Sequence, residues 1–241
     1  MEAKVTRVNI GSAMNEGTGM FKLRIMGSTL VVSFPRETRV LSWAILNGGI
    51  RPNVKHIVNH HVEGSTLENE PDTLLRQVAS RLGLKGTVVG MMTAADVGQY
   101  SIAQASYEDL TACSIATAGC ANLATVGEEG KYLDHRAEAI CPNTINSIVV
   151  ANYQFTHEAM LEAIQIVTEA KVKVMYEFGL RSKATGEPAT GTGTDCVAVA
   201  VGHDRRYVFC GKHTKWGELL GRATLESVRA AIRATLARQS G

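Results

Sequence analysis

The stretch Ile145-Asn146-Ser147-Ile148-Val149-Val150-Ala151 contains no charged residue and no proline, and most of its side chains are small or β-branched. Such a composition is typical of a strand that is covered on both faces of a sheet. Leu110–Ala118 has the same character. We therefore predict that these two stretches form the centre of a sheet.

Shorter strand patterns lie on both sides of this centre. Phe21–Met26 and Leu30–Phe34 flank a Gly-Ser turn, which favours a β-hairpin. Near the end of the chain, Cys196–Val201 and Arg206–Cys210 have the composition of strands, and a Gly-His-Asp turn would join them as a second hairpin. Hairpins make the predicted sheet at least partly antiparallel.

His157–Leu180 is the clearest helix of the sequence. Its apolar side chains recur with the helical period of 3.6 residues. Thr156 is suited to cap the N-terminus of this helix, and Gly179 is suited to end it.

Two further helices are expected. One covers Thr73–Leu82 with Asp72 as its N-cap, and the other is amphipathic and runs from Lys215 or Leu219 to Ala237. The mixed order of strands and helices predicts an α/β fold, in which helices are layered on a mixed, partly antiparallel sheet. We expect residues 1–241 to form a single compact domain.

The composition excludes several classes of protein. The chain has 241 residues, of which 45% are hydrophobic and 20% charged, so it is neither disordered nor fibrous. Its formal charge of +2 comes without a run of Lys or Arg, so we expect no nucleic-acid partner. No stretch reaches the roughly 20 apolar residues of a membrane helix, and an odd number of scattered cysteines fits a reducing compartment. We therefore expect a cytoplasmic protein without a membrane partner.

The loop Ala189-Thr190-Gly191-Thr192-Gly193-Thr194-Asp195 lies just before an apolar strand. It lacks the lysine of a phosphate-binding loop, and no helix follows it, so the nucleotide-binding motif is absent. Alternating Gly and Thr instead place hydroxyls and unshielded amides around the Asp195 carboxylate. This arrangement suits a polarised carbonyl or an activated water.

Other polar groups stand at the ends of apolar strands, where scaffolds usually present reactive groups. Each also has a structural explanation: Asn47-Gly48 favours a plain turn, Asp96 could cap the next segment, and the small residues at 117–121 could serve tight packing. The candidates are Asn47, Gly48, Gly49, Thr93, Asp96, Asn122, Asn143, Thr144 and Asn146.

Lys171 falls on the apolar stripe of the long predicted helix, whereas Glu169 lies on another face. A lysine stem could pack on the core while its ammonium group reaches water. Alternatively, the helix delivers a charge under the sheet to a site. Glu169 is not expected to pair with Lys171.

Histidines suggest zinc only weakly. His56, His60 and His61 lie in Val54–Val62, a predicted strand, where an exposed polar face explains them equally well. Cys196 and Cys210 have the surroundings of core residues and no nucleophile signature. We therefore predict no metal site.

Seven stretches, taken in order from about residue 40 to the end, resemble the adenosylcobinamide amidohydrolase family. They are 41–49, 91–96, 117–122, 144–146, 168–171, 189–195 and 211–218. Residues 1–39, a β-rich segment, show little of this resemblance. Pro142 and Asn143 stand where the family pattern has Gly. Ala121 stands where the pattern has Ser, which excludes a mechanism that needs a hydroxyl at position 121.

The resemblance implies hydrolysis of the amide between aminopropanol and the propionate arm of the corrin ring, giving adenosylcobyric acid in corrinoid salvage. A corrin is a wide, mostly apolar disc fringed by amides, so its pocket needs small apolar walls and scattered polar groups. The substrate-binding candidates are then Asn47, Gly48, Gly49, Thr93, Asp96, Asn122, Thr144, Asn146 and Glu169, with Trp43, Tyr153 and Trp216 as aromatic contacts to the disc.

The catalytic candidates are Asp195, Thr192, Thr194, His213 and Lys171. Asp195 would activate water or orient His213, Thr192 and Thr194 would hold the oxyanion, and Lys171 would stabilise charge. A Thr192 nucleophile is the competing mechanism. No cofactor is required beyond the cobalt-containing substrate.

Two other classes of function remain open at this point. A corrinoid-binding protein would keep the pocket without the chemistry, and a metal-dependent hydrolase of another small amide would use the histidines at 56–61. The expected partner is a small corrinoid molecule, and a homo-oligomer is compatible with the sequence.

Overall fold

The computed structural model describes residues 3–7, 19–63, 70–130 and 143–239. Within these ranges nine strands form one mixed sheet in the order β1-β6-β7-β9-β12-β3-β4-β5, with β2 paired to β3. The strands are β1 (Lys4–Arg7), β2 (Lys22–Met26), β3 (Thr29–Ser42), β4 (Gly49–His61), β5 (Thr87–Thr93), β6 (Ser101–Tyr107), β7 (Leu110–Ala118), β9 (Ile145–Ala151) and β12 (Cys196–Val201).

The remaining elements are short strand pairs and helices. The pairs are β10 (Gln154–Phe155) with β13 (Arg206–Tyr207), and β8 (Leu123–Ala124) with β11 (Gly191–Thr192). The helices are α2 (Pro71–Arg81), α3 (His157–Glu177) and α4 (Lys215–Gln239), with a 3-10 turn η1 (Val97–Gln99). No helix in the described ranges is long and apolar enough to cross a membrane.

Strands β7 and β9 occupy the centre of the sheet, as the sequence predicts. Every residue of β9 is buried, and β9 pairs antiparallel with β7 and parallel with β12. The mixed, partly antiparallel α/β fold is therefore confirmed.

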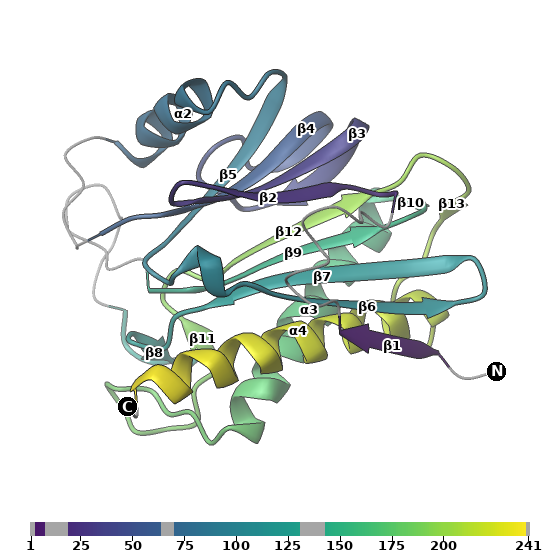
Figure 1. Ribbon diagram of the computed structural model, residues 1–241. Helices are drawn as coiled ribbons and strands as arrows, with labels where there is room; N and C mark the ends of the chain where they lie inside the picture. Colours follow the sequence, from purple (N-terminus) through teal and green to yellow (C-terminus); the bar gives the residue numbers. More distant parts are fainter. Residues whose placement is uncertain (1–2, 8–18, 64–69, 131–142, 240–241) are drawn as a thin grey trace.

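A bend in β3 folds the sheet over itself. The pairing of β3 with β4 shifts register between Ser33 and Val40, around Pro35, which cannot donate a ladder hydrogen bond. The second half of β3 pairs with β12 and the first half with β2, so β2 to β5 lie over β12, β9 and β7 (Figure 1). Apolar side chains such as Ile57 and Met91 meet Ile115 and Ile148 between the two halves.

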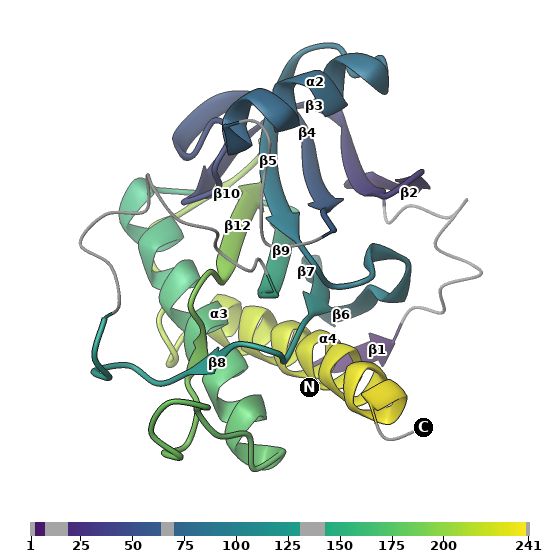
Figure 2. The same ribbon diagram turned by 90° about the vertical axis from the view of Figure 1, so that its left-hand side faces the viewer.

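Helices cover the outer faces of this folded sheet (Figure 2). Helices α3 and α4 pack on the half that contains β9 and β12, through residues such as Met160, Val167 and Leu220. Helix α2 packs on β4 and β5 through Leu75. The layers are therefore helix, half-sheet, half-sheet, helices.

The ends of α3 are those predicted. Thr156 Oγ1 accepts a hydrogen bond from Ala159 N at 3.2 Å, and Gly179 has a φ of 61° just beyond the helix. The predicted cap of α2 is wrong, because the helix begins at Pro71 and Asp72 lies inside its first turn. Proline is favoured at that first position since its φ is already helical and it has no N–H to satisfy.

The predicted hairpin after β12 is also wrong. Gly202 N donates to Tyr153 O at 3.1 Å, and a side chain at Gly202 would collide with the backbone of Asn152. This close approach directs the chain to β10, so only Arg206–Tyr207 forms a strand and it pairs in parallel there. Strand β6, rich in small and polar residues, was not predicted.

Candidate active site

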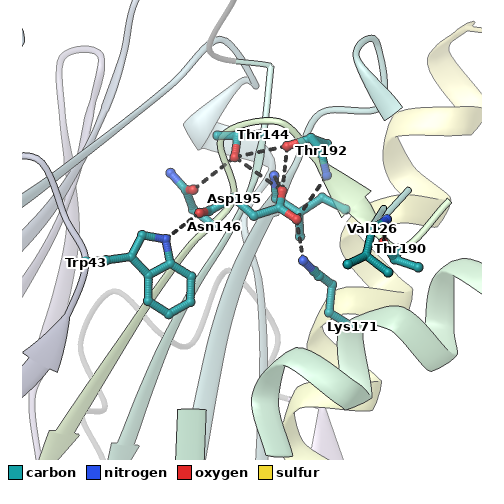
Figure 3. A network of polar contacts seen from close by, with 9 residues as sticks. Trp43, Val126, Thr144, Asn146, Lys171, Thr190, Thr192 and Asp195 are labelled. Atoms are coloured by element: carbon teal, nitrogen blue, oxygen red, sulfur yellow. Dashed lines mark hydrogen bonds and ion pairs between the residues drawn. The ribbon is translucent and has the colours of Figure 1, made fainter. Parts of the chain in front are cut away.

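Four elements bring polar side chains to one end of the central strands. Strands β9 and β12 are parallel neighbours in which Asn146 is paired with Cys196. The residues just before them, Thr144 and Asp195, therefore lie side by side. Strand β11 adds Thr192, and α3 adds Lys171 from below the sheet (Figure 3).

The Asp195 carboxylate is the centre of this network. Its Oδ1 accepts hydrogen bonds from Thr192 Oγ1 at 2.6 Å, from Ile145 N at 2.9 Å and from Thr144 Oγ1 at 3.4 Å. Its Oδ2 accepts a bond from Thr192 N at 3.0 Å and forms an ion pair with Lys171 Nζ. Since a carboxylate offers about four lone-pair positions, both oxygens are fully used.

Lys171 reaches Asp195 from the buried stripe of α3. The side chains of both residues are 10% exposed, so the pair is almost fully withdrawn from water. Gly191 leaves the necessary space, because a Cβ there would lie 2.9 Å from Lys171 Nζ. The ammonium group of Lys171 therefore does not reach water. The structure supports the other alternative, in which α3 places this charge beneath the sheet, here against Asp195.

Asn146 connects the network to the folded-over half of the sheet. Its Nδ2 donates to Asn59 Oδ1 and to Met92 O, both at 2.9 Å, and its Oδ1 lies 3.3 Å from Thr144 Oγ1, whose one hydroxyl hydrogen is shared with Asp195 Oδ1. Asn59 donates in turn to Thr117 Oγ1 at 2.9 Å. Because Asn146 is 2% exposed and both hydrogens of its amide are donated within the protein, it holds the site together and leaves little surface for a ligand.

Sequence reasoning missed Asn59. The available signal was an amide in the middle of the predicted strand Val54–Val62, directly after the apolar residues Ile57 and Val58. Such a buried polar group requires a partner. The partner lies on β9, far away in the sequence, so the signal could not identify it.

Trp43 borders the network on another side. Its Nε1 donates to the carbonyl oxygen of Asp195 at 2.7 Å, and the indole is 49% exposed. Figure 3 shows the Asp195 cluster between Trp43 and Val126, which is 84% exposed. Exposed apolar groups therefore flank the polar centre.

Asn47, Gly48 and Gly49 lie outside the network. Asn47 has a φ of 56° and donates through Nδ2 to Val88 O at 2.8 Å, while Gly49 has a φ of 82°. A Cβ at Gly48 would lie 2.5 Å from Ala44 O. These contacts support the plain-turn alternative, and Asn47 instead lines a separate cavity of about 780 Å³ beside α2.

Thr93 and Asp96 also have structural partners. Thr93 is fully buried and accepts a hydrogen bond from Ala95 N at 3.0 Å. Asp96 Oδ1 accepts from Gly98 N at 2.8 Å, so Asp96 caps η1, which agrees with its structural explanation. Asp96 also binds Arg238 and lines a cavity of about 210 Å³.

Glu169 and His213 lie apart from Asp195. Glu169 does not pair with Lys171, as predicted, and forms an ion pair with Lys212 at 2.6 Å. His213 is exposed, and both His213 and Glu162 lie near Gly211. Glu162 and Lys171 are on the same helix, α3, and a rise of 1.5 Å per residue separates them by about 13 Å along its axis. None of the partners of Asp195 within the described residues is His213, so their expected contact is wrong.

Thr194 and Asn122 complete the predicted set. Thr194 Oγ1 is buried and has no hydrogen-bond partner within residues 3–7, 19–63, 70–130 and 143–239. Asn122 is partly buried in the turn before β8. Pro142, which departs from the family pattern, lies outside the described residues.

The thiols near the site are not nucleophiles at neutral pH. Burial raises the pKa of Cys196 to about 12, and burial together with the negative charge of Asp195 raises the pKa of Cys120 to about 11. Both thiols therefore stay protonated.

The three histidines have separate partners. His56 Nδ1 is 2.9 Å from Ser33 Oγ, His60 Nδ1 is 2.8 Å from Thr29 Oγ1, and His61 Nδ1 is 3.0 Å from Ala95 O. Within the part of the chain that the structure describes, no three His, Cys, Asp or Glu side chains are placed to hold a metal ion.

Comparison with known families identifies the class. A family model of amide-hydrolysing enzymes, described as adenosylcobinamide amidohydrolase, matches residues 16–240. The protein is thus related to hydrolases. More specifically, the chain belongs to the adenosylcobinamide amidohydrolase family, as its sequence motifs indicate.

Two relatives match more than three quarters of this chain. An uncharacterized protein of Methanocaldococcus jannaschii is 30% identical over 222 residues, covering 85% of both chains. The adenosylcobinamide amidohydrolase of Methanosarcina mazei is 27% identical over 197 residues, covering 78% of this chain and 86% of that protein. A crystal structure of a Pyrococcus horikoshii protein aligns with 98% of this chain and 84% of its own at a TM-score of 0.42 and 12% identity, a likeness too low to support an argument.

Proposed function

We propose that this protein hydrolyses the amide that joins aminopropanol to the corrin ring of adenosylcobinamide, giving adenosylcobyric acid for corrinoid salvage. Family membership supports the reaction class. The observation that carries the proposal is the hydroxyl of Thr192, held 2.6 Å from a carboxylate that is paired with a buried lysine. An activated hydroxyl beside an acid–base group is the equipment of amide hydrolysis.

Thr192 is the nucleophile in this proposal, and Asp195 is its base. Direct activation of water by Asp195, the first mechanism considered, would need a free carboxylate lone pair, and the protein donors already use all of them. The Thr192 hydroxyl, in contrast, already directs its hydrogen at Asp195 Oδ1. The geometry thus favours the competing mechanism.

The proposed reaction has two steps. Thr192 Oγ1 attacks the amide carbon while its proton moves to Asp195, and the tetrahedral intermediate expels the amine, which takes that proton. This leaves an ester on Thr192 and free aminopropanol. The esterified Thr192 Oγ1 no longer donates to Asp195 Oδ1, so a water molecule can donate there. This water attacks the ester while Asp195 takes its proton and returns it to Thr192 Oγ1, and the corrin carboxylic acid is released.

Lys171 acts as a positioning residue in this scheme. Its ammonium group holds Asp195 Oδ2 so that Oδ1 faces Thr192. The Thr194 hydroxyl and the amides of loop 191–195 other than that of Thr192, which donates to Asp195 Oδ2, are proposed to stabilise the oxyanion, since such donors contribute most when they are preorganised.

The test of this function is to incubate the purified protein with adenosylcobinamide and to follow the products by mass spectrometry. Release of aminopropanol together with adenosylcobyric acid supports the proposal. Binding without release would identify a non-catalytic corrinoid-binding protein. We propose that no metal cofactor is needed, so dialysis against a chelator should leave the rate unchanged, whereas a loss restored by zinc would indicate a metal-dependent hydrolase.

A further inference from the structure

Three aromatic side chains were candidates for contact with a flat ring, and the structure separates them. Trp216 is 2% exposed and packs edge-on against Phe155, with ring centroids 5.0 Å apart. Tyr153 packs on the same Trp216 and donates to Asp109 at 2.7 Å. Both lie beyond the C-terminal end of β9, whereas Asp195 lies beside its N-terminal end. The seven residues of β9 span roughly 23 Å at 3.3 Å per residue. Of these three aromatic side chains, only Trp43 adjoins Asp195.

Trp43, Ile45 and Ile50 are three exposed large apolar side chains at the turn between β3 and β4, where Ile50 is paired with Leu41, two residues before Trp43. Their exposed fractions are 49%, 51% and 39%. Ala44 and Leu46 are buried, so the chain alternates and directs Trp43 and Ile45 outward. Adjacent large apolar groups left in water are a mark of a binding surface.

The indole of Trp43 is held before any ligand arrives. Its Nε1 is bound to Asp195 O at 2.7 Å. The neighbouring Ser42 Oγ donates to Val197 O at 2.8 Å and accepts from Ala44 N at 3.0 Å, which anchors the backbone on both sides of Trp43. A fixed aromatic face loses little entropy when a ligand covers it.

We propose that the surface of Trp43, Ile45 and Ile50 is the platform on which the corrin ring of the substrate lies. This inference rests on the proposed function, because it takes a flat, mostly apolar macrocycle as the ligand. The indole is bound to the backbone of the residue whose carboxylate holds Thr192. A ring on this platform therefore places its edge, and the amide arm at that edge, beside the nucleophile.

Two substitutions at Trp43 test the platform. Trp43→Ala removes both the ring face and the hydrogen bond to Asp195, whereas Trp43→Phe removes the hydrogen bond and keeps a smaller aromatic face. The matched control is Phe209→Ala, since Phe209 is 63% exposed and follows β13. The measurements are kcat and KM for adenosylcobinamide, and Kd for adenosylcobyric acid by calorimetric titration.

We expect Trp43→Ala to raise both KM and Kd about tenfold, equivalent to about 1.4 kcal/mol. The kcat of Trp43→Ala should fall by less than its KM rises. Trp43→Phe keeps an aromatic face but loses the hydrogen bond that holds it, so its Kd should rise by about two- to threefold, and Phe209→Ala should bind as the unaltered protein does. Unchanged Kd in Trp43→Ala would overturn the platform. An equal loss of kcat in both Trp43 variants would also overturn it, because both lack the hydrogen bond to Asp195 and the result would show that Trp43 acts through this bond.

The failures of the two proposals are distinguishable. If the unaltered protein releases aminopropanol and Trp43→Ala binds adenosylcobyric acid equally well, the function stands and the platform is wrong. If the unaltered protein binds adenosylcobyric acid through Trp43 but releases no aminopropanol, the platform stands and the hydrolase function is wrong.

Discussion

The Thr192 hydroxyl is the smallest group on which the proposed chemistry depends. Thr192→Val keeps the shape of the side chain and removes its oxygen, so we expect kcat for adenosylcobinamide to fall by roughly 1,000-fold or more. Thr192→Ser retains the hydroxyl and should keep measurable activity. Steady-state rates together with urea unfolding check this, and a Thr192→Val protein that stays folded and active would exclude the nucleophile.

The ion pair of Lys171 and Asp195 separates stability from activity. Lys171→Met leaves a carboxylate buried without its counter-charge, and such one-sided loss costs about 3–5 kcal/mol of unfolding free energy. Lys171→Met combined with Asp195→Asn carries no charge there, so we expect most of that stability to return. Activity should stay lost in both variants.

Urea unfolding of the two variants, each compared with the unaltered chain, measures the effect. If the double variant is no more stable than Lys171→Met, the charge imbalance is not the cause of the loss. If it regains activity as well as stability, Asp195 is not the base.

The turn between β3 and β4 depends on a glycine. Gly48→Ala would place a Cβ 2.5 Å from Ala44 O, a backbone atom that cannot rotate away, so we expect a loss of roughly 1–3 kcal/mol. Gly130→Ala is the control, because nothing lies within 4 Å of a Cβ there. Its effect should stay within about 0.5 kcal/mol. Equal unfolding midpoints for the two variants would contradict the close approach.

The helix α3 and the strand β9 illustrate what local sequence can predict. The 3.6-residue period, Thr156 and Gly179 determine α3 and both its ends, because each acts through neighbours within one or two turns. Strand β6 was missed because its small and polar residues carry no such period. Its place in the sheet comes from pairing with β7.

The two halves of the folded sheet are joined by a buried polar bridge. Asn59 lies on β4 and Asn146 on β9, and each is 2% exposed. We expect Asn59→Ala and Asn146→Ala each to cost about 1–3 kcal/mol, since buried partners lose their hydrogen bonds. The double variant should cost less than the sum, with a coupling of at least about 0.5 kcal/mol in a double-mutant cycle. Additive losses in urea unfolding would show that the bridge does not couple the halves.

The composition of the candidate site was predictable only in part. Asp195 and Thr192 stood out because a Gly-Thr loop before an apolar strand exposes amides and hydroxyls, and Lys171 stood out because a charge on an apolar stripe is unusual. Asn47 and His213 were grouped with them because they stand in the stretches 41–49 and 211–218, which resemble the family. The structure turns Asn47 toward Val88 and leaves His213 beside Gly211.

The sequence by itself determined the central strands, the long helix and the family, because periodicity and short motifs act over a few residues. Only the tertiary structure decided that β3 bends, that Asn59 meets Asn146, and that Trp43 lies against Asp195. These contacts join residues between 87 and 152 positions apart. The direction of a side chain across such a distance depends on how the whole sheet curves, and no local pattern contains that information.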